Sequence, residues 1–137
     1  PEAASKAVPA TPGTTIKEGR IGIRDFLDVL AQTEGVMGIL LVNNEGLVAE
    51  ACWIDTVDQE EFGALARDME AEIQRQLGHS QFVDYESLLI ESQDLVINMI
   101  PLKESMLIIK ATGRINLGTL RLKMNSLFSR LDEDYLK

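Results

Sequence analysis

Two apolar runs separated by a short polar turn constrain the fold of this chain most strongly. Residues 36–42 and 47–53 are rich in Val, Ile, Leu and Trp, and the sequence Asn43-Asn44-Glu45-Gly46 lies between them. Asn and Gly tolerate the positive φ angles that tight turns require, so the pattern predicts a β-hairpin. Because four polar residues exceed the shortest hairpin loop, the turn type stays open. The turn contains no obvious catalytic group.

Apolar residues recur at helical spacing on both sides of this hairpin in the sequence. A short helix is predicted before Gly35, with Ile23, Phe26, Leu27 and Leu30 on one face. A longer helix is predicted from Asp58 to about Leu77, because Asp58 and Glu61 have the spacing of a capping box and Gly78 follows. Its predicted buried stripe is Phe62, Leu65, Ala66, Met69, Ile73 and Leu77.

The remainder of the chain predicts three more strands and a last helix. The strands cover residues 82–91, 95–101 and 105–112, and short polar connections favour hairpins between them. Asn116 is a favourable cap for a final helix whose apolar stripe is Leu117, Leu120, Met124, Leu127, Phe128 and Leu131. The order α-β-β-α-β-β-β-α predicts an α+β fold in which helices flank a five-stranded, mostly antiparallel sheet.

Length and composition fit a single domain with two tails. We expect a flexible Pro/Ala/Thr-rich tail or linker at 1–20, one domain at 21–131, and a C-terminal tail at 132–137 that frays. The formal net charge is −9, from 22 acidic and 13 basic residues, which argues against nucleic-acid binding. The single cysteine, Cys52, favours the cytoplasm. Since no apolar run approaches the roughly 18–20 residues that span a bilayer, we expect no membrane insertion.

No constellation of residues predicts an enzyme. The chain lacks the glycine-rich phosphate loops and the nucleophile elbow of common enzyme families. The only histidine, His79, follows a helix-ending glycine, and the acidic residues of the 58–77 helix fit a solvated face. We therefore expect no catalytic residues, no cofactor and no metal. Trp53 ends a strand, and both a packed role and a partner-anchoring role are open.

The 82–91 segment and the long helix together suggest a homodimer. An exposed apolar edge strand is an aggregation hazard unless it is charged, covered or paired, and pairing with a second copy would extend the sheet across a two-fold axis. The long helix would then meet its mate, with Arg67 and Glu70 pairing reciprocally. An ordinary solvated helix row is the alternative. The expected dimer-interface residues are Gly63, Arg67, Glu70, Gln74, Val83, Tyr85 and Ser87.

Three stretches carry a resemblance to a known family. The sequence G-V-M-G-I-L-L-V-N-N-E-G-L-V-A-E-A followed by E-F-G-A-L-A-R-D-M resembles the Roadblock family, and A-T-G-R-I-N-L-G-T-L-R-L-K-M is similar to that family's last strand and helix. The family includes dynein light chains of the Roadblock type and MglB-like regulators of Ras-like GTPases. The resemblance covers about residues 21–131. It implies a profilin-like fold, a homodimer with a continuous sheet, and no active site.

The expected function follows from this resemblance. We expect a homodimeric, non-enzymatic regulator or scaffold of a Ras-like small GTPase. The dimer would dock on the GTPase through its paired second helices, and in one version of this hypothesis it stimulates GTP hydrolysis. Arg67, Glu70 and Gln74 are the candidate partner-binding residues. Two alternatives stay open: an adaptor similar to a dynein light chain, without effect on a GTPase, and a domain that senses a small molecule.

Overall fold

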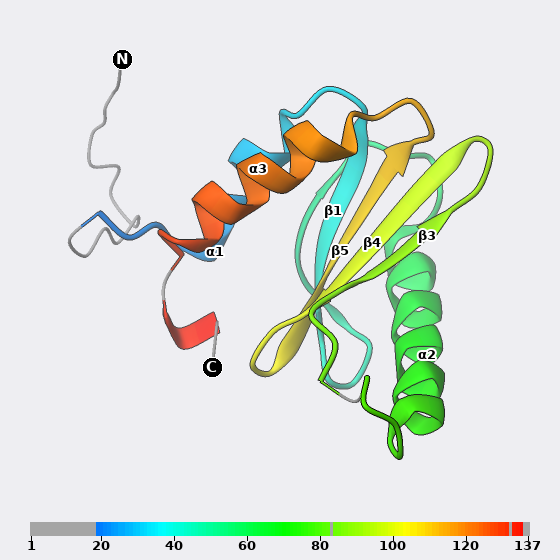
Figure 1. The fold of residues 1–137 in the computed structure, drawn as a ribbon. Coiled ribbons are helices and arrows are strands. Elements are labelled where there is room, and N and C mark those ends of the chain that lie inside the picture. Colours follow the sequence, from blue (N-terminus) through cyan, green and yellow to red (C-terminus); the bar gives the residue numbers. More distant parts are fainter. Residues whose placement is uncertain (1–18, 83, 132, 136–137) are drawn as a thin grey trace.

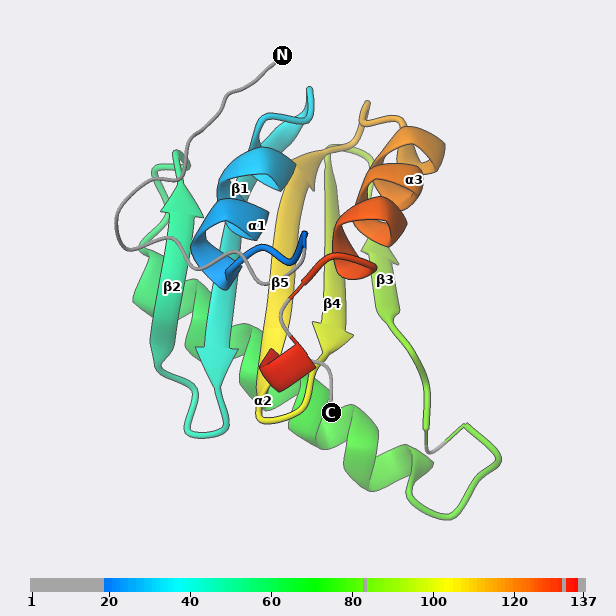
Figure 2. The same ribbon diagram turned by 90° about the vertical axis from the view of Figure 1, so that its left-hand side faces the viewer.

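A five-stranded antiparallel sheet with the strand order β2-β1-β5-β4-β3 organises the chain (Figures 1 and 2). The structure is a computed structural model that describes residues 19–82, 84–131 and 133–135. The predicted fold class and element order are confirmed. The elements are α1 (Ile23–Ala31), β1 (Val36–Asn43), β2 (Val48–Trp53), α2 (Gln59–Leu77), β3 (Leu88–Glu91), β4 (Leu95–Pro101), β5 (Ser105–Thr112) and α3 (Leu117–Phe128).

The β1–β2 turn has a defined geometry. The N–H of Gly46 donates to the carbonyl of Asn43 at 3.0 Å, and Gly46 has a φ of +87°. The Asn43 side-chain oxygen accepts from the N–H groups of Glu45 and Leu47 at 2.9 and 3.0 Å. A β-turn followed by a glycine with positive φ is typical of a three-residue hairpin loop. This resolves the turn type that the sequence leaves open.

Helices cover both faces of the sheet. Figure 2 shows α1 and α3 on one face and α2 crossing the other. Successive residues of a strand point to opposite faces, so Ile39 and Leu41 of β1 pack in the core under α1 and α3, whereas Leu40 and Val42 pack under α2. The central strands β1 and β5 are therefore buried on both sides, which explains their nearly continuous apolar sequences.

The buried face of α2 differs from the predicted stripe. Asp58 caps the helix as predicted, accepting from the N–H groups of Glu60 and Glu61 at 2.8 and 3.2 Å. The placement of Leu65 in the core is wrong, because its side chain is 56% exposed. Gly63 faces the sheet instead, where a Cβ would lie 3.2 Å from Val48 and 3.3 Å from Val42. Because Gly63 lies against the sheet, a different face of α2 is buried from the one predicted. The buried residues of the helix are Phe62, Gly63, Ala66 and Glu70.

The strand predicted at 82–91 is wrong in its first half. β3 contains Leu88–Glu91 alone, while Tyr85 and Ser87 lie in the irregular segment before it and Val83 lies outside the described residues. The physical reason is a tertiary contact: the Tyr85 hydroxyl donates to Glu70 of α2 at 2.6 Å, which holds this segment at the helix. Local sequence pattern cannot report such a contact.

Backbone hydrogen bonds hold the two ends of the described domain. The N–H of Ile21 donates to the carbonyl of Arg130 at 2.7 Å, which joins the start of the domain to the end of α3. Within the segment predicted to fray, Glu133–Tyr135 form a short 3-10 helix. The carbonyl of Tyr135 accepts from the N–H of Lys103 at 3.1 Å, so this helix is held at the β4–β5 turn. Residues 1–18, 132 and 136–137 lie outside the described residues.

Replacement of Gly38 by alanine is expected to destabilise the fold. Gly38 of β1 pairs with Trp53 of β2, and a Cβ there would lie 2.1 Å from the Trp53 ring. The ring cannot yield freely, because its Nε1–H donates to the Val57 carbonyl at 2.7 Å and it packs against Phe62. We expect Gly38→Ala to lower the free energy of unfolding by about 1–3 kcal/mol. Urea unfolding, followed by the fluorescence of this single tryptophan, measures the change.

Gly22→Ala is the matched control. A Cβ at Gly22 meets nothing within 4 Å, and its φ is −79°, so this variant is expected to lose less than about 1 kcal/mol. Equal unfolding midpoints for the two variants would contradict the steric role of Gly38.

Candidate protein-interaction site

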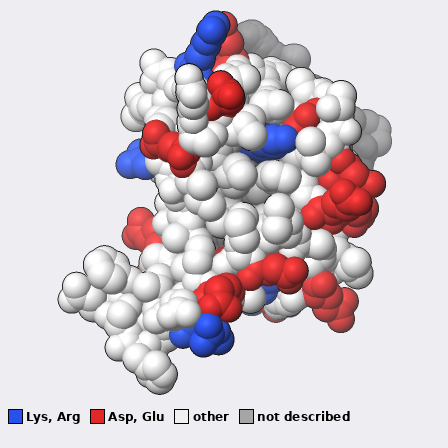
Figure 3. Space-filling view, turned by 90° about the vertical axis from the view of Figure 1, so that its right-hand side faces the viewer, with Lys and Arg blue, Asp and Glu red and all other residues white. Residues whose placement is uncertain are grey.

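The side of the molecule formed by α2 and β3 combines a broad uncharged area with charged residues along α2, where Glu60, Glu61, Asp68, Glu72 and Arg75 are exposed. Figure 3 views the molecule from this side and shows a broad area of uncharged side chains bordered mainly by acidic groups. Large apolar side chains are exposed here on α2, on the α2 face of β3 and in the segment between them: Leu65, Ile90 and Phe82. Such patches on a soluble domain are typical of protein-binding surfaces.

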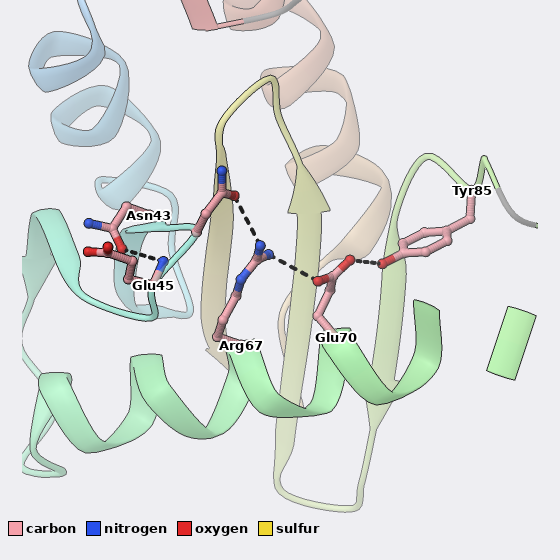
Figure 4. Close-up of polar contacts among 6 residues, drawn as sticks. Asn43, Glu45, Arg67, Glu70 and Tyr85 are labelled. Carbon is pink, nitrogen blue, oxygen red and sulfur yellow. Dashed lines mark hydrogen bonds and ion pairs between the residues drawn. The ribbon is translucent and has the colours of Figure 1, made fainter. Parts of the chain in front are cut away.

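A hydrogen-bonded network crosses this region from the exposed Asn44 to the buried Glu70 (Figure 4). The Arg67 guanidinium donates to Glu70 Oε1 at 3.0 Å and to the Asn44 side-chain oxygen at 3.0 Å. Tyr85 donates to the second carboxylate oxygen of Glu70. The network therefore links the β1–β2 turn, α2 and the segment before β3.

Glu70 is the centre of the network and is almost completely buried, with 5% of its surface exposed. A buried carboxylate is stable when it is paired and hydrogen-bonded, and Arg67 and Tyr85 supply both interactions. Burial and the hydrogen bond to Glu70 raise the pKa of Tyr85 well above its usual range, so its hydroxyl remains a donor at physiological pH.

The structure corrects the expected arrangement of the helix row. Within the protomer, Arg67 and Glu70 pair with each other one turn apart on α2. Their reciprocal pairing across two copies stays a prediction. The acidic residues of this helix are predicted on a solvated face, and for Glu70 this is wrong, because its carboxylate turns toward Arg67 and Tyr85. Gly63 faces the sheet of its own chain, and Gln74 is half-buried one turn beyond Glu70.

The remaining predicted interface residues lie apart from this network. Ser87 is exposed and borders a cleft of about 330 Å³ between β4 and α3. Val83 lies outside the described residues. The structure therefore brings together Arg67, Glu70 and Tyr85, and it leaves Gly63 and Ser87 elsewhere.

A second polar pair was not predicted. Lys110 on β5 and Asp55 in the β2–α2 loop form an ion pair in which both side chains are more than nine-tenths buried. The Lys110 ammonium also lies 5.2 Å from the centre of the Phe62 ring and 5.9 Å from that of Trp53. The signal that sequence reasoning missed is a single lysine within the apolar strand S-M-L-I-I-K-A-T.

Trp53 is a packed residue in this protomer. It is half-buried, it contacts Phe62 at a ring-centre distance of 5.3 Å, and its indole N–H is satisfied by Val57. These contacts favour the packed role over partner anchoring, which the sequence alone leaves undecided.

The described residues offer little for catalysis or metal binding. His79 is exposed after α2, and Cys52 is half-buried against the core under α1. Within residues 19–82, 84–131 and 133–135, no group of three or more His, Cys, Asp or Glu side chains could hold a metal ion. In the same ranges, no helix has the length and apolar character needed to cross a bilayer.

Comparison with known proteins identifies the family. The model of the Roadblock/LC7 domain matches residues 23–111, which is more than half of the chain. The chain belongs to the Roadblock/LC7 domain family. The match ends at the last residue but one of β5, so α3 lies beyond it, whereas the sequence resemblance extends to residue 131. Roadblock/LC7 domains are regulatory and adaptor domains.

Relatives of similar sequence and structure support this assignment. Two uncharacterised proteins of Methanocaldococcus jannaschii are each 28% identical over 95 residues, which covers 69% of this chain and 83% of the relative. A Roadblock/LC7 domain from Streptomyces avermitilis has a TM-score of 0.64 at 17% identity, covering 77% of this chain and 91% of that one. Myxococcus xanthus MglB has a TM-score of 0.66 at 16% identity, with coverages of 79% and 89%. At these identities the structural likeness shows a shared fold.

Removal of the Asp55 carboxylate is expected to destabilise this Roadblock/LC7 domain in a pH-dependent way. Asp55→Asn leaves the buried Lys110 charge without its partner, which we expect to cost about 3 kcal/mol of unfolding free energy at pH 7. The hydrogen bond from Lys110 holds the pKa of Asp55 below its usual value of 3.8. The stabilisation is therefore complete above pH 3.8, and it is lost as pH falls through the lower folded-state pKa.

Chemical denaturation of wild type and Asp55→Asn at several pH values measures this effect. The stability difference between the two proteins should be equal at pH 7 and pH 5, and it should shrink below pH 4. Asp58→Asn is the control, because asparagine caps helices as well as aspartate does. A difference that grows on acidification would contradict the ion-pair account.

Tyr85→Phe is expected to weaken the hydrogen-bonded network. Loss of the hydroxyl leaves one oxygen of the buried Glu70 without its donor, which we expect to cost about 1–3 kcal/mol. Tyr135→Phe is the matched control, since the Tyr135 hydroxyl makes no hydrogen bond within the described residues. Thermal unfolding compares the two variants. If Tyr85→Phe unfolds at the temperature of Tyr135→Phe, the hydroxyl does not stabilise Glu70.

Proposed function

We propose that this chain is a homodimeric, non-enzymatic regulator or scaffold of a Ras-like small GTPase. The observation that carries the proposal is the group of exposed apolar side chains on α2 and β3 in a Roadblock/LC7 domain that holds no evident catalytic group in its described part. MglB proteins, whose fold this chain shares, belong to the relatives that regulate Ras-like GTPases, and one solved MglB has a tetrameric arrangement.

The edge strand β3 supports self-association. β3 contains four residues and pairs with β4 on one side, so its other side offers free backbone N–H and carbonyl groups. Leu89 and Ile90 are exposed on this strand, with 38% and 39% of their surfaces accessible. Antiparallel pairing of β3 with its copy would cover these side chains and produce a continuous sheet across a two-fold axis.

The outer side of α2 supports docking of the GTPase. Leu65 is exposed on this helix between the acidic residues Glu61 and Asp68. Arg67 and Gln74 lie at the margin of the same surface and remain candidate contacts, whereas Glu70 acts by holding Arg67. A docked Roadblock dimer would order the GTPase switch segments so that the GTPase's own groups align the attacking water.

Small-molecule sensing is the second candidate function. Two clefts include a buried residue with an oxygen that has no hydrogen-bond partner in the described structure: Thr33 in a cleft of about 490 Å³, and Asn98 in the cleft beside Ser87. A ligand donor would satisfy such an atom. Native mass spectrometry of the purified chain tests this function, because a bound small molecule would add to the protein mass.

A GTP turnover assay tests the leading proposal. The full chain is mixed with a Ras-like GTPase encoded beside it, and both binding and phosphate release are measured with GTP and GDP. We expect binding to depend on the nucleotide, and Leu65→Glu to weaken it about tenfold, because a charge would enter an apolar contact. Binding that is indifferent to the nucleotide favours an adaptor, and no binding contradicts the proposal.

Sedimentation equilibrium tests the dimer separately. We expect a dimer at tens of micromolar, and we expect Ile90→Lys to shift it to monomer by placing a charge in the joined sheet. Leu122→Lys is the matched control. Leu122 is 73% exposed on α3, which covers the face of the sheet opposite to α2. A wild-type monomer, or equal effects of both variants, would contradict the β3 interface.

A further inference from the structure

The strand β2 forms the second edge of the sheet, and an arginine caps its outward side. The Nη1 group of Arg24 on α1 donates to the carbonyl of Ala51 at 2.7 Å. Since the N–H and carbonyl of one strand residue point to the same side, the Ala51 N–H also faces away from β1. Ile54, three residues after Ala51, faces β1 as this alternation requires, because its N–H donates to the carbonyl of Met37 at 3.2 Å.

The arginine cap is removable. Arg24 forms ion pairs of 3.5 Å with Asp28 and 3.6 Å with Glu50, and all three side chains are more than one-third exposed. Exposed ion pairs of this kind contribute little to stability. A competing N–H donor can therefore take the place of Arg24 at the Ala51 carbonyl, while the guanidinium turns to solvent.

An apolar cleft lies beside the same edge. It has a volume of about 340 Å³ between the end of α1 and the strands β1 and β2, and its apolar walls are Ala31, Val36, Met37, Cys52 and Ile54. Ile54 is 80% exposed at its mouth. Cys52 contacts the core under α1, so the cleft opens on the α1 face of β2.

We propose that the β2 edge binds an extended segment of a partner protein by β-strand addition. Main-chain hydrogen bonds to Ala51 would hold the segment, and a side-chain pocket would select it, as in other strand-addition sites. Opposite Cys52, the side chain of the added strand points into the apolar cleft. Opposite Glu50, two residues away on the same face, it meets the carboxylates of Glu50 and Asp28.

Register and charge define the sequence of the partner. In an antiparallel addition, the residue opposite Cys52 precedes the residue opposite Glu50, so the segment reads apolar-x-basic. Displacement of Arg24 leaves Glu50 and Asp28 available for the basic side chain, and the chain's net charge of −9 favours such a segment. A second copy of β2 fits poorly, because antiparallel self-pairing brings Glu50 of both copies to the same edge.

The probe for this site is the labelled peptide acetyl-Thr-Val-Thr-Leu-Thr-Lys-Thr-amide, and fluorescence anisotropy with the full chain measures its binding. We expect the composition-matched peptide acetyl-Thr-Val-Thr-Lys-Thr-Leu-Thr-amide to bind more weakly, because it places lysine in the apolar cleft. N-methylation of the threonine between leucine and lysine should weaken binding about tenfold, since it removes the donor to Ala51. N-methylation of the lysine, whose N–H faces away from β2, should have little effect.

Protein variants locate the binding to β2. Ala51→Pro removes an N–H that faces outward and places a ring on the edge, so we expect a loss of about tenfold or more with the β1–β2 ladder intact. Arg24→Ala removes the competing donor and should strengthen binding about threefold. Arg121→Ala is the control for the change in net charge, because Arg121 is exposed on α3 and borders a different cleft.

Three outcomes would overturn the proposal. These are equal binding of the peptide N-methylated at the central threonine, equal binding by Ala51→Pro, and no binding of the probe to either wild type or Arg24→Ala. Circular dichroism confirms that each variant is folded. Because the two peptide modifications use the wild-type protein, they test the site even when a variant does not fold.

Discussion

The buried ion pair between Lys110 and Asp55 fixes how α2 lies on the sheet. Lys110 extends from the central strand β5 toward the α2 face, where a charge without a partner would be costly. The β2–α2 loop therefore has to bring Asp55 onto the sheet, and Trp53 and Phe62 close over the pair. Because α2 begins four residues after Asp55, the position of the pair sets where the helix starts and which of its residues meets the strands. Gly63 then lies against β1 and β2, and Leu65 points outward.

The second polar anchor acts at the other half of α2. Glu70 is buried, yet it is bonded by Arg67 of its own helix and by Tyr85 of the following segment, so the helix is held by polar contacts as well as by apolar ones. The first anchor fixes the start of α2, and the second turns the carboxylate of Glu70 inward. The outer side of the helix is thereby left with exposed apolar and acidic side chains. A regulatory or adaptor domain acts through contact with its partners, so the position of these exposed side chains matters for its role.

Local sequence pattern predicts most of the fold and little of the site. The strands β1, β2, β4 and β5 and the caps at Asp58 and Asn116 depend on neighbouring residues, and the structure confirms them. The errors depend on distant contacts. The stripe on α2 is displaced because Gly63 approaches Val42 and Val48, and the segment before β3 is irregular because Tyr85 bonds Glu70. The lysine in β5 is visible in the sequence, but its partner lies 55 residues away and cannot be identified without the sheet order.

The two edges of the sheet differ in a way that matters for assembly. If β2 and β3 were both self-complementary, successive copies could add to both edges and an open filament would follow. β3 is short and exposes Leu89 and Ile90, which suits the proposed pairing with its own copy. β2 carries Glu50 and is capped by Arg24, and self-pairing there would bring like charges together. In the proposed dimer the joined sheet therefore ends in two copies of β2, each closed to another copy but open to a basic partner segment. In this proposal Glu50 disfavours a second copy at the edge, and the same carboxylate attracts the basic side chain of a different protein once Arg24 is displaced.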